Sequence, residues 1–189
     1  MLRPKTLLLP AIITLFAAGC INDGKQSDAS SCDDDGFDAA NTTDTTLYGA
    51  CGDDTAMHTL QLVTDTGDTL TISLADENGE QTDIHGGLMG GDRMAVTALR
   101  GNDGTLTATL VVNTTTLLGR WTSIDKDFVI EEGGTVTSST ADETHPWVAW
   151  KIFNGHLVMN ADTFDIIALG ADSLFLENAE GIYVYERKM

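Results

Sequence analysis

The fold class is decided by residues 150–187, which read WKIFNGHLVMNADTFDIIALGADSLFLENAEGIYVYER. Short apolar runs with many β-branched and aromatic residues alternate here with reversals that contain Asn-Gly, Gly-Ala-Asp and Asn-Ala-Glu-Gly. Asn, Asp and Gly tolerate the positive φ angles of tight hairpin turns. The stretch therefore predicts an antiparallel meander with strands near residues 147–152, 156–160, 163–169, 172–177 and 182–187.

The same alternation of strands and turns continues upstream. Three further strands are predicted near residues 118–122, 127–132 and 135–139, with a turn at Glu132-Gly133-Gly134. Eight antiparallel strands can close into a barrel, which leaves no exposed edge. A barrel of this size either fills itself with side chains or encloses one small ligand, and the sequence leaves both open. The side chains that would line or gate a cavity are Trp147, Trp150, Phe153 and Met159.

Gly119-Arg120-Trp121 lies on the first of these strands, and later segments follow it in order at residues 128–135, 150–157, 172–176 and 183–187. The opening is similar to the Gly-x-Trp motif of lipocalins, and the order and spacing resemble the lipocalin-like lipoproteins of Bacteroidales over residues 117–189. In the barrel family a tryptophan of the first strand packs against an arginine near the last. Trp121 and Arg187 match those positions. The resemblance implies an extracytoplasmic lipocalin-like barrel closed at one end by this pair, most often of unassigned function.

Residues 47–116 predict a second, smaller β-domain. Alternating apolar residues at 60–64 and 70–74 flank Asp65-Thr66-Gly67-Asp68, which predicts a hairpin, and further strands are predicted at 94–99 and 105–112. Four or five strands in this length suit a small barrel of OB-like or SH3-like size. The glycine-rich residues 86–91 are interpreted as a flexible connection, because a phosphate site would need a lysine and a helix start.

The amino terminus carries the pattern of a secretion signal with lipid attachment. Arg3 and Lys5 precede an apolar run from Leu7 to Phe16, and Ala17-Ala18-Gly19-Cys20 follows. This arrangement resembles a bacterial lipobox, in which residues 1–19 are the signal peptide and Cys20 is acylated with fatty acids such as palmitate. Several acyl chains would hold the protein on a membrane, which implies an outer-membrane lipoprotein of the cell envelope. The alternative is an ordinary secretory signal in which Cys20 occurs by chance.

Residues 20–46 predict an acidic flexible tether. They contain Gly, Ser, Asn, Thr and the cluster Asp33-Asp34-Asp35, with almost no apolar periodicity. Such a segment cannot bury enough surface to offset the loss of backbone entropy on folding. Acidic residues after the lipidated cysteine resemble the surface-export signal of Bacteroidales lipoproteins. Because the acids lie further downstream here, periplasmic and surface-facing positions both stay open.

Two cysteines remain if Cys20 is acylated. Cys32 and Cys51 could form a disulfide in an oxidising compartment, which would close a loop of about 20 residues and stabilise the first barrel by about 3 kcal/mol. The alternative is two free thiols, because the distance between the residues cannot be judged from the sequence.

Charge and motif content exclude several classes of function. With 29 acidic and 10 basic side chains the net charge is −19, which argues against a nucleic-acid groove or a face for anionic lipid. Asp65-Thr66-Gly67 spells the aspartic-protease triplet, but it occurs once and in a predicted turn. Asp33 and Asp35 are similar to part of a calcium loop, but Ser31 and Thr42 stand at ligand positions. The four histidines lack zinc-site spacing.

The sequence thus predicts no catalytic residue, metal site or cofactor. We expect a non-enzymatic binding or accessory module that meets the membrane through its lipid anchor, with a small apolar ligand or an envelope protein as partner. One alternative is a structural, interaction or inhibitor lipoprotein that acts through the surface loops of a solid barrel. The other is a hydrolase assembled from scattered acidic and histidine side chains.

Overall fold

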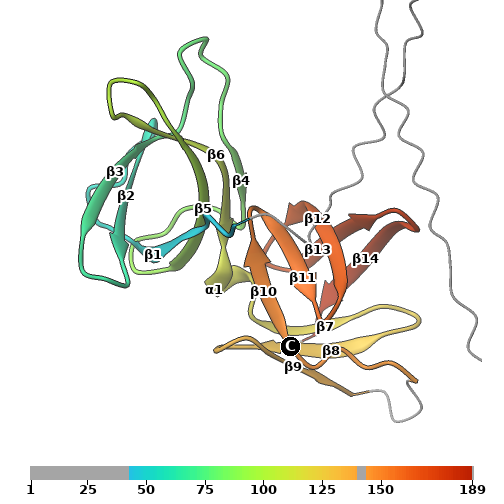
Figure 1. Cartoon of the computed structure of the whole chain (residues 1–189). Coiled ribbons are helices and arrows are strands. Elements are labelled where there is room, and N and C mark those ends of the chain that lie inside the picture. Colours follow the sequence, from blue (N-terminus) through green and yellow to red (C-terminus); the bar gives the residue numbers. More distant parts are fainter. Residues whose placement is uncertain (1–42, 140–143, 189) are drawn as a thin grey trace, which may run out of the picture. The chain divides into compact units, whose positions relative to one another are not determined.

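The structure is a computed structural model that describes residues 43–139 and 144–188. Within these residues the chain forms fourteen β-strands, β1 to β14, and one helix of four residues, α1 (Figure 1). The strands make two barrel-like sheets, one closed and one nearly closed, which belong to the same compact unit. The prediction of an all-β chain with barrel-like sheets is confirmed. The predicted signal peptide, and the predicted tether before residue 43, lie outside the described residues.

The first barrel consists of five strands: β1 (Leu47–Cys51), β2 (Thr59–Thr64), β3 (Thr69–Ser73), β5 (Arg93–Arg100) and β6 (Leu106–Asn113). Neighbours pair antiparallel in the order β3-β2-β1-β5-β6, and a parallel pairing of Ile72 with Leu106 joins β3 to β6 and closes the ring. The short strand β4 (Asp83–His85) pairs in parallel with β6 at residues 110–112, next to β3. The free edge of β6 is therefore covered by two strands in succession.

The second barrel follows α1 (Thr114–Leu117) and contains β7 (Gly119–Thr122), β8 (Asp127–Glu131), β9 (Thr135–Ser138), β10 (Trp150–Phe153), β11 (His156–Met159), β12 (Asp162–Leu169), β13 (Ser173–Asn178) and β14 (Gly181–Arg187). All neighbours are antiparallel, in the order β10-β11-β12-β13-β14-β7-β8-β9. Between the outer strands β9 and β10, the N–H of Val136 donates to the carbonyl of Val148 at 3.0 Å, and that of Trp150 donates to Gly134 at 2.8 Å. These bonds nearly close the barrel.

The predicted strands of the second barrel lie within a few residues of the observed ones, with one clear difference. The strand predicted at 147–152 begins only at Trp150. The side-chain oxygen of Asn160 accepts hydrogen bonds from the backbone N–H groups of Val148 and Ala149, at 2.9 and 3.2 Å. These bonds occupy donors that a regular ladder would use, so the segment before Trp150 forms an isolated bridge at Ala149 instead.

In the first barrel, β1 and β4 were not predicted as strands. β1 has a weak alternation because it contains Gly49, where a Cβ atom would overlap the carbonyl oxygen of Val63 on β2. The connection at residues 86–91 also differs from the prediction of a flexible segment. The N–H of Gly86 donates to the carbonyl of Leu169 at 3.0 Å, and a Cβ at Gly86 would lie 2.9 Å from Asn113. Its first residue is therefore tightly packed.

Asn113 organises the joint between the two barrels. Its side-chain oxygen accepts from the N–H of Thr116 and caps α1, while its amide nitrogen donates to Gly86, Gly87 and Asp92. Asn113 is 1% exposed, so these bonds satisfy a buried polar group. The hydrophobic core of the second barrel continues into the first through Ala95, Val112 and Leu117. The joint is thus part of the packed structure.

The predicted tether also extends too far. Residues 43–46 belong to the tether in the prediction, but Thr45 donates from its N–H and hydroxyl to the side-chain oxygen of Asn154, at 2.8 and 2.9 Å. The N–H of Asn154 in turn donates to the hydroxyl of Thr46 at 2.9 Å. These side-chain bonds hold the chain before β1 against the β10–β11 turn, a tertiary contact that local composition does not indicate.

Candidate functional site

The interior of the second barrel is filled with aromatic and aliphatic side chains. The ring of Phe128 meets those of Trp147 and Tyr185 edge to face, with centroids 5.1 Å apart in both pairs. Trp147 also meets Phe164 at 5.7 Å in the same geometry, which is a favourable arrangement of aromatic quadrupoles. The sequence left two alternatives open, a barrel filled with side chains and a barrel that encloses a ligand. The contacts of these residues fit the first alternative.

The four side chains predicted to line or gate a cavity lie in different surroundings. Trp147 and Met159 are buried in the core, at 5% and 0% exposure. Trp150 is half-buried and donates from its indole N–H to the carbonyl of Glu131 at 2.8 Å. Phe153 is half-buried, with the ammonium nitrogen of Lys151 4.5 Å from its ring centroid. The structure does not bring the four together around one space.

Trp121 and Arg187, by contrast, lie together. They are register partners on β7 and β14, and the guanidinium carbon of Arg187 is 4.2 Å from the ring centroid of Trp121. The guanidinium donates to three backbone carbonyls, those of Ala171 at 2.5 Å, Leu118 at 2.7 Å and Thr116. Burial lowers the pKa of Arg187. The three hydrogen bonds of the Arg187 guanidinium therefore join α1, the residue before β7 and the turn after β12 at one end of the barrel.

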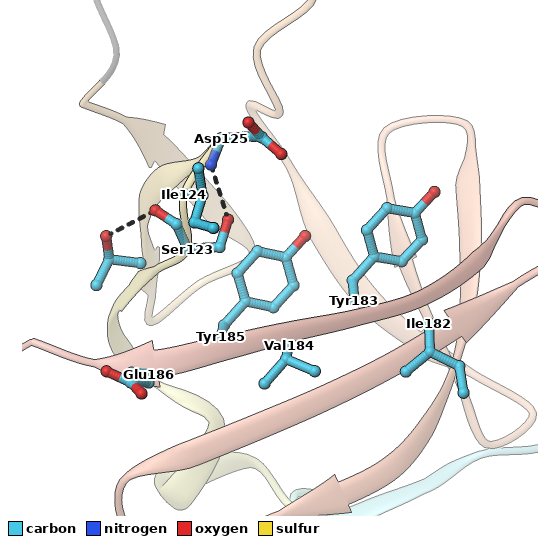
Figure 2. A pocket seen from close by; sticks show the side chains of 9 residues that line it. Ser123, Ile124, Asp125, Ile182, Tyr183, Val184, Tyr185 and Glu186 are labelled. Carbon is cyan, nitrogen blue, oxygen red and sulfur yellow. Dashed lines mark hydrogen bonds between the residues drawn. The ribbon is translucent and has the colours of Figure 1, made fainter.

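An open groove of about 580 Å³ runs between β14 and the turn that joins β7 to β8; we call it the β14 groove (Figure 2). Its lining residues are Thr122, Ser123, Ile124, Asp125, Ile182, Tyr183, Val184, Tyr185 and Glu186. Figure 2 shows Tyr183 and Tyr185 on the side of β14 that faces the turn and Val184 on the opposite side. Apolar side chains thus occupy both faces of this strand.

Three apolar side chains of the β14 groove are strongly exposed. Ile182 is 62% exposed, Val184 48%, and Ile124 at the tip of the turn is fully exposed. Exposed apolar residues that gather around a groove mark contact surfaces more often than isolated ones do. The sequence carried a signal for this site, because the run Ile182-Tyr183-Val184-Tyr185 has no polar face. From the sequence alone the run predicts only a strand near residues 182–187.

A smaller groove of about 270 Å³ lies where the two barrels meet, lined among others by Tyr48, Arg93, Glu132, Trp150 and Lys151. The hydroxyl of Tyr48 donates to the carbonyl of Ile152 at 2.5 Å. Burial, and then the charge of Asp44, raise the pKa of Tyr48 to about 12. Tyr48 is therefore a neutral hydrogen-bond donor that joins β1 to β10.

The chemical motifs considered in the sequence do not assemble into a reaction centre among the described residues. Asp65, of the Asp-Thr-Gly triplet, accepts hydrogen bonds from Arg93, which lower the pKa of its carboxyl. His156 and Asp165 form a pair with 2.5 Å between Nδ1 and Oδ1, and His85 lies 3.3 Å from Asp83. Residues 43–139 and 144–188 contain no group of three metal-ligating side chains.

Two of the three cysteines in the sequence predictions lie outside the described residues. Cys20 and Cys32, and the acidic residues compared with a calcium loop, precede residue 43. Cys51 is buried at 3% exposure on β1, with its sulfur 3.3 Å from the hydroxyl of Thr55. The Cys32–Cys51 disulfide and the lipid attachment at Cys20 stay predictions.

No known protein family, curated protein or solved structure matches this chain. In the part of the chain that the structure describes, no helix is long and apolar enough to cross a membrane. The β14 groove is the candidate functional site, since three strongly exposed apolar side chains, those of Ile124, Ile182 and Val184, line the same hollow.

Proposed function

We propose that the mature chain is a lipid-anchored protein of the bacterial cell envelope whose β region is a non-enzymatic interaction module. The lipobox-like residues Ala17-Ala18-Gly19-Cys20 support the anchor, which would sit in the outer membrane with the barrels facing the periplasm or the cell surface. The folded region acts through its outer surface on an envelope protein, in an accessory, structural or inhibitory role.

The observation that carries this proposal is the distribution of apolar side chains. The interior of the second barrel is occupied by a buried cluster that includes Trp121, Phe128 and Tyr185. Exposed apolar residues gather instead at the β14 groove, where Ile124 and Ile182 have more than half of their surface in solvent. A surface site for a protein therefore fits the molecule better than an interior site for a small apolar ligand.

Two features of architecture support the same function. The second barrel is an antiparallel meander in which Trp121 meets Arg187, as the lipocalin resemblance implies. The first barrel has five strands with a parallel closure between β3 and β6, which is the connectivity of an OB-fold. Folds of these two kinds present binding residues on loops and strand surfaces, which supports an interaction module.

Site-specific photo-crosslinking in intact cells tests the proposed surface. A photoreactive amino acid at Ile124 or Ile182 is expected to crosslink to a discrete envelope protein. The matched control is Ile167, which is 48% exposed and lies on β12 of the same barrel, outside the β14 groove. Identical crosslinking patterns at all three positions, or none at any, would contradict a binding surface at the β14 groove.

Metabolic labelling with palmitate tests the anchor. The wild-type chain is expected to incorporate the label and to fractionate with outer membranes, and Cys20→Ser to lose both properties. The matched control is Cys32→Ser, which keeps the proposed acylation site. Equal labelling of Cys20→Ser and wild type would refute the lipoprotein proposal and leave the surface proposal standing.

A further inference from the structure

We propose that β14 binds an extended segment of a partner protein as an added β-strand, along the backbone edge left open at Ile182 and Val184. The partner segment would alternate apolar and basic side chains. The inference rests on the proposed function and names the chemistry of its partner.

The direction of the backbone groups on β14 follows from two hydrogen bonds at its C-terminal end. The N–H of Arg187 donates to the carbonyl of Asp172, the residue before β13, at 2.8 Å, and that of Lys188 donates to the carbonyl of Arg120 on β7 at 2.9 Å. In an antiparallel ladder successive residues bond to opposite neighbours. The register between β13 and β14 is unbroken from Ser173↔Glu186 to Asn178↔Gly181. Even-numbered residues of β14 therefore direct their N–H and carbonyl groups toward β7.

β7 ends before it reaches Ile182 and Val184. Its pairing with β14 covers only Glu186↔Thr122 and Arg187↔Trp121. The chain then turns away, because the N–H of Ser123 donates to Lys126 at 2.7 Å and closes the β7–β8 hairpin. No described strand pairs with Ile182 or Val184 on this side. An unpaired edge of this kind is a template for strand addition.

The β14 groove gives an incoming strand room beside this edge. It occupies about 580 Å³ between β14 and the β7–β8 turn, and Figure 2 shows Ile124 and Ser123 on its far side. A strand added to β14 would place alternate side chains on its two faces. One set would meet Tyr183 and Ile124, and the other would meet Val184 and Ile182. In a partner that alternates apolar and basic residues, the apolar set would cover the exposed side chains on one face and the basic set would lie on the other.

The charged side chains that line the β14 groove indicate which polar residues the partner segment carries. The nine lining residues include two carboxylates, Asp125 and Glu186, and no cation. The nearest lysine along the chain, Lys126, has its ammonium nitrogen over the ring of Trp147, 3.9 Å from the centroid. A second copy would bring the same acidic groups and another net charge of −19 to the contact, which like-charge repulsion opposes. Basic side chains complement the groove.

The test uses the full-length chain and a synthetic ten-residue peptide of alternating lysine and valine. We expect binding by isothermal titration calorimetry, weakened by added salt, and much weaker binding of the glutamate–valine peptide. Val184→Pro removes an N–H that faces the groove and leaves the bonds to β13 in place. It is expected to weaken binding about tenfold or more. Val184→Thr keeps the N–H and a β-branched side chain, and is expected to bind within about threefold of wild type.

Modified peptides test strand addition on the wild-type chain, so this test does not depend on whether Val184→Pro folds. Two further peptides carry N-methyl groups on every valine or on every lysine. A strand pairs through one edge, so one of the two should lose binding and the other should keep it. Equal behaviour of both peptides, unchanged binding to Val184→Pro, or no binding of the parent peptide would overturn the proposal. A dimer in sedimentation velocity that Val184→Pro dissociates would overturn the choice of partner.

These outcomes separate the two proposals. If peptides fail to bind but crosslinks at Ile124 and Ile182 persist in cells, strand addition is wrong and the surface site stands. If both fail, the β14 groove is not a binding site.

Discussion

The two barrels solve the same problem, the unpaired edge of a sheet, in different ways. In the first barrel the edge of β6 is covered by β3 at residues 106–107 and by β4 at residues 110–112. In the second barrel the pairing between its last strand, β14, and its first, β7, covers only two register positions and is reinforced by the side chain of Arg187. Continuous backbone pairing leaves little room for a partner, whereas this short pairing leaves part of the β14 edge open beside a groove.

The largest expected effect comes from removing the aromatic core where β7 pairs with β14. Trp121→Ala deletes a fully buried indole and should lower the free energy of unfolding by about 3–5 kcal/mol, through lost burial and the cavity that remains. Urea denaturation followed by circular dichroism measures it. Ile167→Ala, at a position 48% exposed on β12, is the control and should change stability by less than about 1 kcal/mol.

The same experiment shows whether the barrels unfold together. All three tryptophans lie between residues 121 and 150, so the fluorescence of the remaining two reports on the second barrel, and circular dichroism reports on both. The shared core at Ala95, Val112 and Leu117 predicts that the two signals change at the same urea concentration. Separate transitions would show that the joint does not couple the barrels.

The next effect tests closure by a side chain. Arg187→Met keeps much of the aliphatic stem and removes the guanidinium that donates to Thr116, Leu118 and Ala171. We expect a loss of about 1–3 kcal/mol, because three backbone carbonyls, two of them in partly buried bonds, then lack a charged donor. Arg120→Met is matched, since Arg120 makes only a partly exposed ion pair with Asp127; it should cost at most about 1 kcal/mol. Equal losses would mean that Arg187 is an ordinary surface cation.

A comparable effect probes closure by the backbone in the first barrel. Gly49→Ala introduces a Cβ against the carbonyl oxygen of Val63, and should cost about 1–3 kcal/mol because β1 must move away from β2. Gly90→Ala is the control, since its nearest contact is the side chain of Asp53 at 3.2 Å. Thermal unfolding compares the two. A Gly49→Ala protein as stable as Gly90→Ala would show that the β1–β2 spacing is adjustable.

The smallest effect depends on pH. The hydrogen bond from Arg93 lowers the pKa of Asp65, so the ionised carboxyl adds stability above its unfolded pKa of about 3.9 and loses it as the pH falls through the folded pKa. The side chains are 43% and 55% exposed, which limits the contribution to about 1 kcal/mol or less. Asp65→Asn should be less stable than wild type at pH 7, and the difference should be smaller at pH 2.

The control for this comparison is Glu177→Gln, on the exposed face of β13. Its stability difference from wild type is expected to be within about 0.5 kcal/mol at both pH values. A deficit of Asp65→Asn that persists unchanged at low pH would show that the carboxyl charge does not stabilise the turn.

How much the sequence predicted differs between the barrels for a physical reason. Strands of the second barrel are separated by turns such as Asn154-Gly155, where Asn154 and Gly155 both have positive φ, and such residues mark strand ends locally. β1 gave little signal because its glycine is required by tertiary contact with β2. β4 is three residues long and is stabilised by pairing with β6, a contact distant in sequence.

The candidate site shows the same limit. Trp121 and Arg187 were found through resemblance, and no local pattern connects two residues so far apart. The β14 groove depends on the residue at which β7 stops pairing, a matter of register and not of composition. The apolar character of both faces of residues 182–185 was visible in the sequence. The sequence does not show that these residues border an open groove, because a fully buried strand has the same apolar pattern.

Closure by Arg187 also has a consequence for the order of folding. Its bond to Leu118 spans 69 residues, whereas the residues Ile72 and Leu106, whose pairing closes the first barrel, lie closer together in the sequence. The entropy lost on joining two chain segments grows with the length between them, and such distant contacts slow folding. We therefore expect the first barrel to close before β14 reaches β7. Until then the edge of β7 that β14 covers would be exposed to chaperones or to misassociation.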